Sequence, residues 1–197
     1  MARKRGISLD DIVASASRLA DEGGWEALTL AAVARDLGIR SPSLYAHVEG
    51  LEGLRRALAI HAADDMARRL DHAAKGKQGE PALRAILREY RRYAHEHPGR
   101  YAAVQRAVPP GQDDELYEAL GSVVVPVVRA LAEAGVEPER RIHLVRALRS
   151  ALHGFVVLET GGGFGRPEST EESFGHLADL LLAGVRRTSN GSRDCES

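Results

Sequence analysis

The sequence has little of what would cross-link a protein or anchor it in a membrane. Its one cysteine, Cys195, cannot form a disulfide within the chain, so we expect a free thiol in a reducing compartment. No apolar run is long enough to cross a bilayer, and no signal-peptide-like apolar segment follows the basic start. We therefore expect a soluble cytoplasmic protein without a membrane partner.

Charge of one sign is also scarce, because the formal net charge is -1 over 197 residues. By count, the first 58 residues hold eight Lys and Arg against eight Asp and Glu. This region is therefore not basic as a whole. Nucleic-acid binding by it would require positive charge sorted onto one face, or contacts from backbone N–H groups at helix N-termini.

The motifs of common enzymes and metal sites are missing as well. There is no P-loop, no His-Glu-x-x-His and no Gly-x-Ser-x-Gly. The glycine-rich run 161–165 follows an apolar segment but lacks the third glycine of a dinucleotide-binding loop. His95 and His97 would lie on different sides of a helix, so they do not form a zinc site alone. We predict no enzymatic activity, no metal and no cofactor.

What the sequence does contain is apolar residues at helical spacing, among many Ala, Leu, Arg and Glu. These patterns predict an all-α fold. The expected helices span 8–22, 29–37, 41–48, 51–73, 81–97, 100–108, 113–134 with a kink at Pro126, 138–159 and 170–186, and a polar tail follows from 189 to 197.

The segment from Thr29 to Val48 reads as helix, tight turn, helix. Thr29 is a good N-cap, and Gly38 stands where a left-handed residue closes a helix without steric cost. The pair 41–42, Ser-Pro, is a second start signal, with Ser as the expected cap. Leu44 and Val48 would bury one face of the short second helix.

The other face of that second helix carries small polar and aromatic groups: Ser43, Tyr45, Ala46 and His47. An ordinary exposed helix face would show Glu and Lys, whereas these groups suit a crowded groove. A helix-turn-helix places such a face in the DNA major groove. The alternative is an αα-turn inside any helical bundle.

This N-terminal region resembles the TetR family of bacterial transcriptional repressors. One position differs, because the family usually has a Lys just after the second helix, where this chain reads Glu49-Gly50-Leu51. The residues that carry the resemblance are Ile12–Ala20, Gly23, Leu28-Thr29, Val33, Leu37-Gly38-Ile39, Ser43-Leu44-Tyr45, His47-Val48 and Leu54.

The resemblance implies a three-helix DNA-binding domain, residues 1–52, and a larger ligand-binding and dimerisation domain, residues 53–188. It implies a ligand-responsive regulator, a repressor, that binds a near-palindromic double-stranded DNA operator as a homodimer and is released by a small-molecule effector. We expect Tyr45 and His47 at phosphates or base edges, and Ser43 and Ala46 at bases. The full expected DNA-binding set is Thr29, Arg40, Ser41, Pro42, Ser43, Tyr45, Ala46 and His47.

Aromatic residues in the second half of the chain are candidates for the effector site, because helical bundles bind small molecules between helices. The alternative is that they are ordinary core residues with a polar edge. The candidates are Tyr90, Tyr93, His97, Tyr101 and Tyr117.

The segment 138–159 is apolar on two sides, which requires two partners. One stripe includes Leu148, Leu152, Phe155 and Val156, and the other includes Leu144, Ala147, Ala151 and Leu158. The resemblance implies that the last two helices pair across a two-fold axis. The expected dimer contacts are Leu148, Leu152, Phe155, Val156, Leu177 and Leu181.

Two readings of the whole chain remain beside the regulator. A helical enzyme would need a catalytic constellation that the sequence does not contain. A helical protein-binding adaptor without DNA binding would fit the near-neutral N-terminal region. The basic run 3–5 fits either a plain disordered start or an arm that reaches phosphates or the minor groove.

Overall fold

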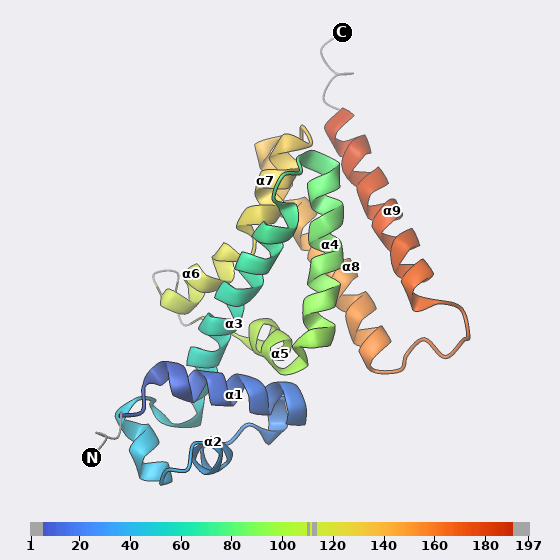
Figure 1. Ribbon diagram of the computed structural model, residues 1–197. Coiled ribbons are helices and arrows are strands. Elements are labelled where there is room, and N and C mark those ends of the chain that lie inside the picture. The colour runs from blue at the N-terminus through green and yellow to red at the C-terminus, as the bar shows by residue number, and fades with distance from the viewer. Residues whose placement is uncertain (1–5, 110, 112–113, 191–197) are drawn as a thin grey trace. The chain divides into compact units, whose positions relative to one another are not determined.

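The computed structural model describes residues 6–109, 111 and 114–190 (Figure 1). These residues form helices and no strand, which confirms the all-α prediction. The elements in chain order are α1 (Leu9–Gly23), η1 (Trp25–Ala27), α2 (Leu30–Asp36), η2 (Ser41–Ala46), α3 (Gly50–Ala74), α4 (Gly79–Glu96), α5 (Pro98–Arg106), α6 (Glu115–Ser122), α7 (Val125–Glu133), α8 (Pro138–Thr160) and α9 (Thr170–Asn190).

The helices divide into two compact units. The head unit comprises Met1–Asp65 and Glu96–Gly121, and the body unit comprises Met66–His95 and Ser122–Ser197. α3 contributes to both, because the division falls inside it. The functional boundary expected between residues 52 and 53 also falls inside α3 and stays a prediction.

The start and end of α1 follow from its sequence. Ser8 and Asp11 form a capping box, in which the Ser8 N–H donates to Asp11 Oδ2 at 2.9 Å and the Asp11 N–H donates to Ser8 Oγ at 3.2 Å. The helix ends where Gly24 takes φ 81°, a value that favours glycine. Its apolar side, which includes Ile12, Ala16 and Ala20, is buried.

The core of the head unit joins elements on both sides of the helix-turn-helix. Leu28, Val33, Leu44, Leu54 and Leu58 are all fully buried. They come from the segment before α2, from α2, from η2 and from the first half of α3. The helix-turn-helix is thus held by residues that the periodic pattern marked as apolar.

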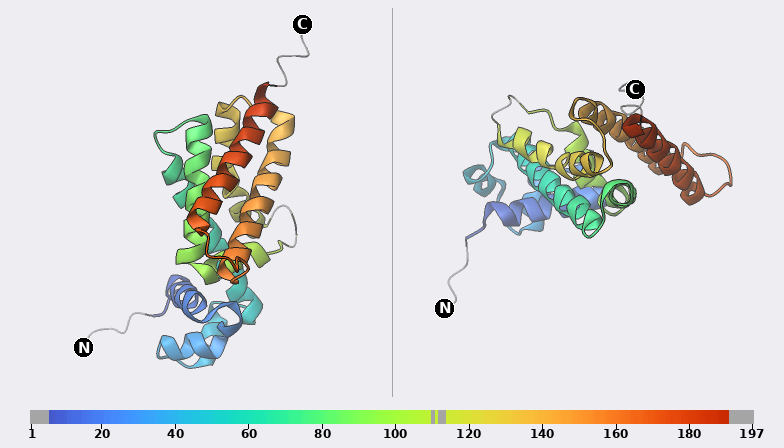
Figure 2. Two further views of the ribbon diagram at one scale, coloured as in Figure 1. Left: turned by 90° about the vertical axis from the view of Figure 1, so that its right-hand side faces the viewer. Right: turned by 90° about the horizontal axis from the view of Figure 1, so that it is seen from above.

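In the body unit, α8 packs against α7 and α9 (Figure 2). Arg91 of α4 ties this arrangement together, since its Nε and Nη2 donate to the two oxygens of Glu159 at 2.9 and 2.6 Å. The same guanidinium also pairs with Glu171 and lies 4.8 Å from the centre of the Phe174 ring. The end of α8 and the start of α9 are therefore both attached to α4.

The segment expected as one kinked helix over 113–134 is two helices. α6 ends at Ser122 and α7 begins at Val125, with Pro126 in the first turn of α7. Proline has no N–H to donate, and its ring clashes with the carbonyl four residues earlier, which belongs to Ser122. Here the proline starts a new helix instead of bending an old one.

The last helix continues four residues beyond the expected end at 186, to Asn190. Cys195, the basic run 3–5 and most of the expected polar tail lie outside the described residues. No helix in the described ranges is both long enough and apolar enough to span a bilayer.

Candidate nucleic-acid interface

The first helix of the helix-turn-helix is capped as its sequence predicts. Thr29 Oγ1 accepts a hydrogen bond from the Ala32 N–H at 3.1 Å, and the Val33 N–H donates to the Thr29 carbonyl at 3.1 Å. This confirms Thr29 as the N-cap of α2. Because its hydroxyl oxygen is engaged in the cap, the side chain of Thr29 fixes where α2 begins.

The turn between the two helices depends on Gly38. Its φ of 67° lies in the left-handed region, as the sequence predicts. The Ile39 N–H donates back to the Ala34 carbonyl at 2.9 Å, and the Gly38 N–H donates to the Arg35 carbonyl at 3.2 Å. These bonds end α2 and direct the chain toward Ser41.

The second helix, η2, is a six-residue 3₁₀-helix where an α-helix was expected. Arg40 occupies its N-cap position and no side chain caps it, so the prediction that Ser41 is the cap is wrong. Pro42 follows in the first turn, where its missing N–H costs nothing. The Ser43 N–H instead donates to the Arg40 carbonyl at 2.9 Å, which is the tighter spacing of a 3₁₀ turn.

The two faces of η2 differ as expected. Leu44 and Val48 are buried, and the Val48 N–H donates to the Leu44 carbonyl at 3.0 Å. The opposite face is exposed, and Tyr45 is its largest side chain at 63% exposure. Of the residues of this second helix that we expect to contact DNA, Ser41 is half-buried. The others are exposed: Pro42, Ser43, Tyr45, Ala46 and His47.

Several charges within residues 1–58, where Lys and Arg equal Asp and Glu in number, are paired with one another. Arg18 and the Ser15 hydroxyl both donate to Asp36, and these two hydrogen bonds, the Ser15 bond first, hold the pKa of the Asp36 carboxyl below its usual value. Arg55 pairs with Glu52 at 2.8 Å. Many of the acids are thus occupied by neighbouring cations.

Two arginines at the helix-turn-helix have no such partner. Arg35 lies in the last turn of α2 and Arg40 precedes η2, and both are exposed. Within the ranges that the structure describes, neither forms an ion pair with a carboxylate. Positive charge is therefore available at the turn, even though Glu49 stands where the family usually continues with a Lys nearby.

The five residues expected to bind an effector divide between the two units. Tyr90 and Tyr93 are buried in the body unit, whereas His97, Tyr101 and Tyr117 belong to the head unit. Tyr117 is largely exposed, so it does not line an enclosed cavity in this chain. Tyr101 is buried on α5, and His97 precedes that helix.

The body unit has a polar pocket of about 670 Å³ that the sequence analysis did not identify. None of the five candidate effector residues lines it. The only local signal is the polar loop between α3 and α4, which contains two lysines. The pocket is lined by Arg68, Asp71, His72, Ala74, Lys75, Gly76, Lys77, Gln78, Arg129 and Glu133.

The expected dimer contacts stay a prediction, and they differ in burial. Leu148, Leu152, Phe155 and Val156 are buried within the chain itself. Leu177 and Leu181 are half-buried and keep their place in the prediction. Helical periodicity showed two apolar stripes on α8 but could not tell which one the chain covers itself.

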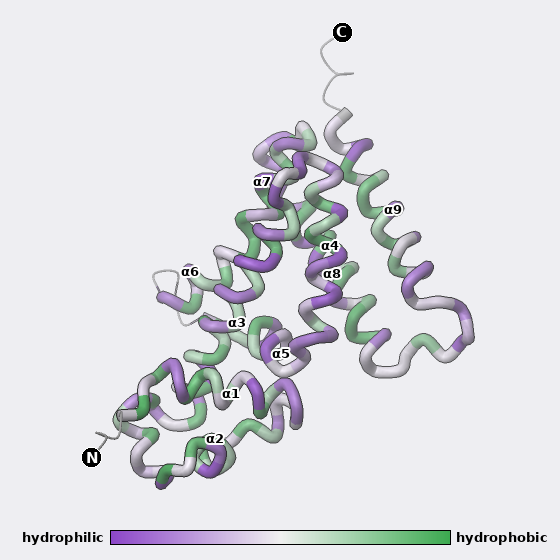
Figure 3. Tube along the Cα trace, viewed as in Figure 1, coloured by the Kyte–Doolittle hydropathy of each residue, from purple (hydrophilic) through white to green (hydrophobic). Residues whose placement is uncertain are grey.

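The second stripe of α8 is the more accessible one. Leu158 is 50% exposed, Ala147 is exposed, and Leu144 and Ala151 are half-buried. On α9, Leu180 is 72% exposed and stands beside Leu177 and Leu181 in the helix. Figure 3 shows hydrophobic residues recurring along α9.

Two family models match this chain. The first is described as bacterial regulatory proteins of the tetR family and covers residues 12–58. The second is described as the tetracyclin repressor-like C-terminal domain and covers residues 83–181. The first match contains the whole helix-turn-helix, and the second contains the aromatic residues of α4 and most of α8 and α9.

Individual relatives agree with the family models. The chain is 38% identical over 192 residues to an uncharacterized HTH-type transcriptional regulator, Rv0681, of Mycobacterium tuberculosis, covering 97% of this chain and 88% of that protein. It is 31% identical to an uncharacterized HTH-type transcriptional regulator, YobS, of Bacillus subtilis, covering 94% and 96%.

Solved structures share the fold. A TetR variant from Acinetobacter baumannii AYE, solved in complex with minocycline, superposes with a TM-score of 0.70 at 20% identity, over 93% of this chain and 98% of that one. These proteins regulate transcription and are not enzymes, which agrees with the absence of catalytic motifs in the sequence. The chain therefore belongs to the TetR family of bacterial transcriptional regulators.

Proposed function

We propose that this regulator binds a near-palindromic DNA operator as a homodimer, represses transcription from the occupied promoter and is released by a small-molecule effector. The observation that carries the proposal is the exposed face of η2, flanked by Arg35 and Arg40, which pair with no carboxylate in the part of the chain that the structure describes. A regulator of this kind binds chromosomal DNA, and it therefore acts in the cytoplasm.

The side chains of the η2 face suit both the base edges and the phosphate backbones of a major groove. Ser43 and Ala46 are small enough to let the backbone approach base edges, where Ala can meet a thymine methyl and Ser can donate or accept. Tyr45 and His47 extend further and reach phosphates or base edges. Arg40 at the turn supplies a cation to the backbone, while Ser41, Pro42 and Thr29 set the path of the chain.

The near-neutral segment 1–58 is compatible with DNA binding because its cations differ in availability. Arg18 and Arg55 are engaged by Asp36 and Glu52, whereas Arg35 and Arg40 are exposed at the turn. Each phosphate neutralised on duplex DNA contributes about 0.9 to the slope of log affinity against log salt. Among the described residues, Arg35 and Arg40 would therefore contribute about 1.8 to this slope if each neutralises one phosphate.

The accessible stripes on α8 and α9 support the homodimer. A symmetric pair of subunits would cover the exposed Leu158 and Leu180 and the small residues Ala147, Gly154 and Gly184, which allow helices to approach closely. The proposed interface replaces the four buried residues and retains two of the expected set. It consists of Leu144, Ala147, Ala151, Gly154, Leu158, Leu177, Leu180, Leu181 and Gly184.

Effector release is supported by the family, whose members respond to small molecules, and by minocycline in the solved structure of one TetR. Tyr90 and Tyr93 of the body unit remain candidates for effector contacts. An effector would act only by binding the DNA-incompatible conformation more tightly than the DNA-bound one.

Selection of bound sequences from a random duplex pool tests the proposal. Wild-type protein should enrich a near-palindrome, with one dimer per site and an affinity that falls as salt rises. The selected operator then allows effectors to be screened by release. No enrichment at low salt would overturn the proposal and favour a protein-binding role.

The Tyr45→Ala variant tests whether the η2 face contacts the operator. It should lower operator affinity about tenfold, since a good contact in the groove contributes about 1–3 kcal/mol. Leu9→Ala, which also shortens an exposed apolar side chain of the head unit, is the control and should leave affinity unchanged. Equal affinity for wild type and Tyr45→Ala would remove Tyr45 from the contact set.

A further inference from the structure

The first turn of α5 is capped by a residue of α1. The Arg100 N–H donates to Asp21 Oδ1 at 2.9 Å, and Arg100 Nε donates to Asp21 Oδ2 at 2.8 Å. His97 occupies the N-cap position of α5 but makes no capping hydrogen bond with its side chain. Asp21, 79 residues earlier, supplies the carboxylate that favours a helix N-terminus.

The backbones of α1 and α5 meet directly beside this cap. A Cβ atom added to Gly99 would lie 2.1 Å from the carbonyl carbon of Ala20 and 2.2 Å from its oxygen. Only glycine fits there, because the obstacle is backbone and not a movable side chain. The separation and register of the two helices are therefore fixed at this point.

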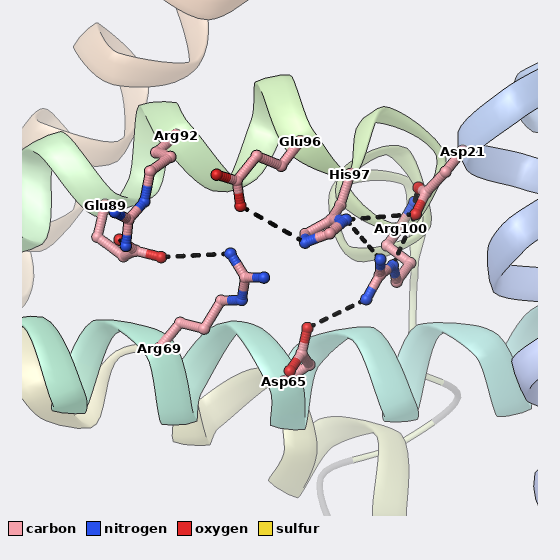
Figure 4. A network of polar contacts seen from close by, with 8 residues as sticks. All are labelled: Asp21, Asp65, Arg69, Glu89, Arg92, Glu96, His97 and Arg100. Atoms are coloured by element: carbon pink, nitrogen blue, oxygen red, sulfur yellow. Dashed lines mark hydrogen bonds and ion pairs between the residues drawn. The ribbon is translucent and has the colours of Figure 1, made fainter.

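Arg100 extends the attachment to a third helix. Its Nη1 donates to Asp65 Oδ2 of α3 at 3.3 Å, so the guanidinium bridges two carboxylates, as Figure 4 shows. The side chains of Asp21, Arg100 and Asp65 are only 14%, 20% and 15% exposed. Charge-assisted hydrogen bonds shielded from water are stronger and more directional than surface ion pairs.

This attachment sits where orientation matters for DNA reading. α1 packs against α2, and α2 packs against η2, so the pose of α1 is transmitted to the reading face. α5 follows α4 after a single residue, His97. Within the head unit, α1 is thus held by α2 and by α5, and Arg100 joins both Asp21 of α1 and Asp65 of α3.

From this geometry we infer that Asp21 and Arg100 are positioning residues for operator binding. They set the angle of α1, so that the two η2 faces of a dimer meet half-sites at one spacing. Neither residue needs to touch DNA. The inference rests on the proposed function, since half-site spacing has meaning only for a dimer on a near-palindrome.

Operators with altered spacing test the inference. Asp21→Ala and Asp21→Asn would be compared with wild type on the selected operator, on one isolated half-site, and on operators whose spacer is one or two base pairs longer or shorter. We expect full-operator affinity to fall roughly tenfold, because coupling changes of this kind amount to about 0.5–2 kcal/mol. Half-site affinity should stay the same, and the preference for one spacer should flatten.

Glu26→Ala is the matched control. Glu26 pairs with Arg106 of the same helix α5 at 2.7 Å, but both side chains are mostly exposed, so its loss should leave spacing preference unchanged. Thermal unfolding and sedimentation would show that each variant is a folded dimer. Asp21→Asn keeps an oxygen for the α5 cap while losing the charge, so it carries the test if Asp21→Ala does not fold.

The outcomes separate the two proposals. Equal losses on half-site and full operator would assign Asp21 a stabilising role only and overturn the inference. An unchanged spacer preference in both Asp21 variants would overturn it as well. If wild-type protein enriches no palindrome, the proposed function itself fails, whatever the variants do.

Discussion

The head unit and the body unit expose opposite chemistry on the faces that we propose to meet partners. The η2 face is small, polar and aromatic, and it comes from one contiguous stretch of six residues. The proposed dimer face is apolar and comes from two helices separated by the loop 161–169. A polar groove and a second protein subunit require different surfaces, and one chain supplies both.

The two faces also depend differently on the rest of the chain. The η2 face is set by a local cap, one glycine and two buried anchors within about twenty residues. The dimer face depends on contacts between residues far apart in the chain, among them those by which Arg91 attaches α8 and α9 to α4. Breaking either arrangement should therefore affect one unit and spare the other.

Leu180→Glu should give the largest effect. Covering this exposed leucine contributes roughly 2 kcal/mol per subunit, and a symmetric interface contains it twice. A buried glutamate adds a further cost. We expect a monomer in sedimentation and operator affinity at least a hundredfold lower, with half-site binding retained.

Val125→Glu is the control for this change, since Val125 is 60% exposed on α7 outside the proposed interface. It should leave the dimer intact. A dimer that persists in the Leu180→Glu variant would place the interface elsewhere.

Arg91→Met should destabilise the body unit by about 3 kcal/mol. Arg91 and Glu159 are only 15% and 8% exposed, and removal of Arg91 leaves the buried carboxylate with His95, at 2.7 Å, in place of a two-bond partner. Chemical denaturation measures the loss. Half-site affinity should not change, because the head unit keeps its own contacts.

Arg84→Met tests whether burial is the cause. Arg84 also links α4 to α9, through Asp179 at 2.7 Å, but the aspartate is 63% exposed. We expect its loss to cost under about 1 kcal/mol. Equal losses in the two variants would contradict the special role of Arg91.

Acid should weaken the body unit through the same pair. The hydrogen bonds from Arg91 first, and then from His95, lower the pKa of Glu159 from 4.5 to about 2. A depressed carboxyl pKa stabilises the folded state above pH 4.5, and this contribution is lost as the pH falls from 4.5 through 2. The free energy of unfolding should drop over that window by up to roughly 3 kcal/mol.

Glu159→Gln should be less stable at neutral pH and should lose this part of the pH dependence. Glu171→Gln, which alters the exposed second acid on Arg91, should keep most of it. An unchanged slope in Glu159→Gln would assign the acid sensitivity to other groups.

Sequence periodicity predicted the helices well but not their breaks. The pattern around Pro126 fits a single kinked helix or two short ones, since both bury the same apolar positions. In the structure α6 ends at Ser122 and α7 begins at Val125, which places Pro126 in a first turn, where a proline is tolerated. Likewise, Ser41 has the composition of a cap, yet the tight 3₁₀ turn of η2 places Arg40 at that position.

The candidate sites show the same division. The exposed η2 residues were identified from spacing alone, because a helix with one buried stripe must expose the other. For the dimer contacts, spacing showed two apolar stripes on α8, and which of them the chain itself covers depends on where α4, α7 and α9 lie. The polar pocket of the body unit could not be predicted, because its lining residues follow no periodic pattern in the sequence.

By itself the sequence determined the all-α fold, the N-cap at Thr29, the left-handed turn at Gly38 and the exposed face of η2. These features follow from interactions between residues close in the chain, whose geometry a helix or a turn dictates. Only the tertiary structure decided which stripe of α8 is buried, where Arg91 finds Glu159, and that Asp21 caps a helix 79 residues later. Such pairings depend on the paths of whole helices, and no local pattern encodes them.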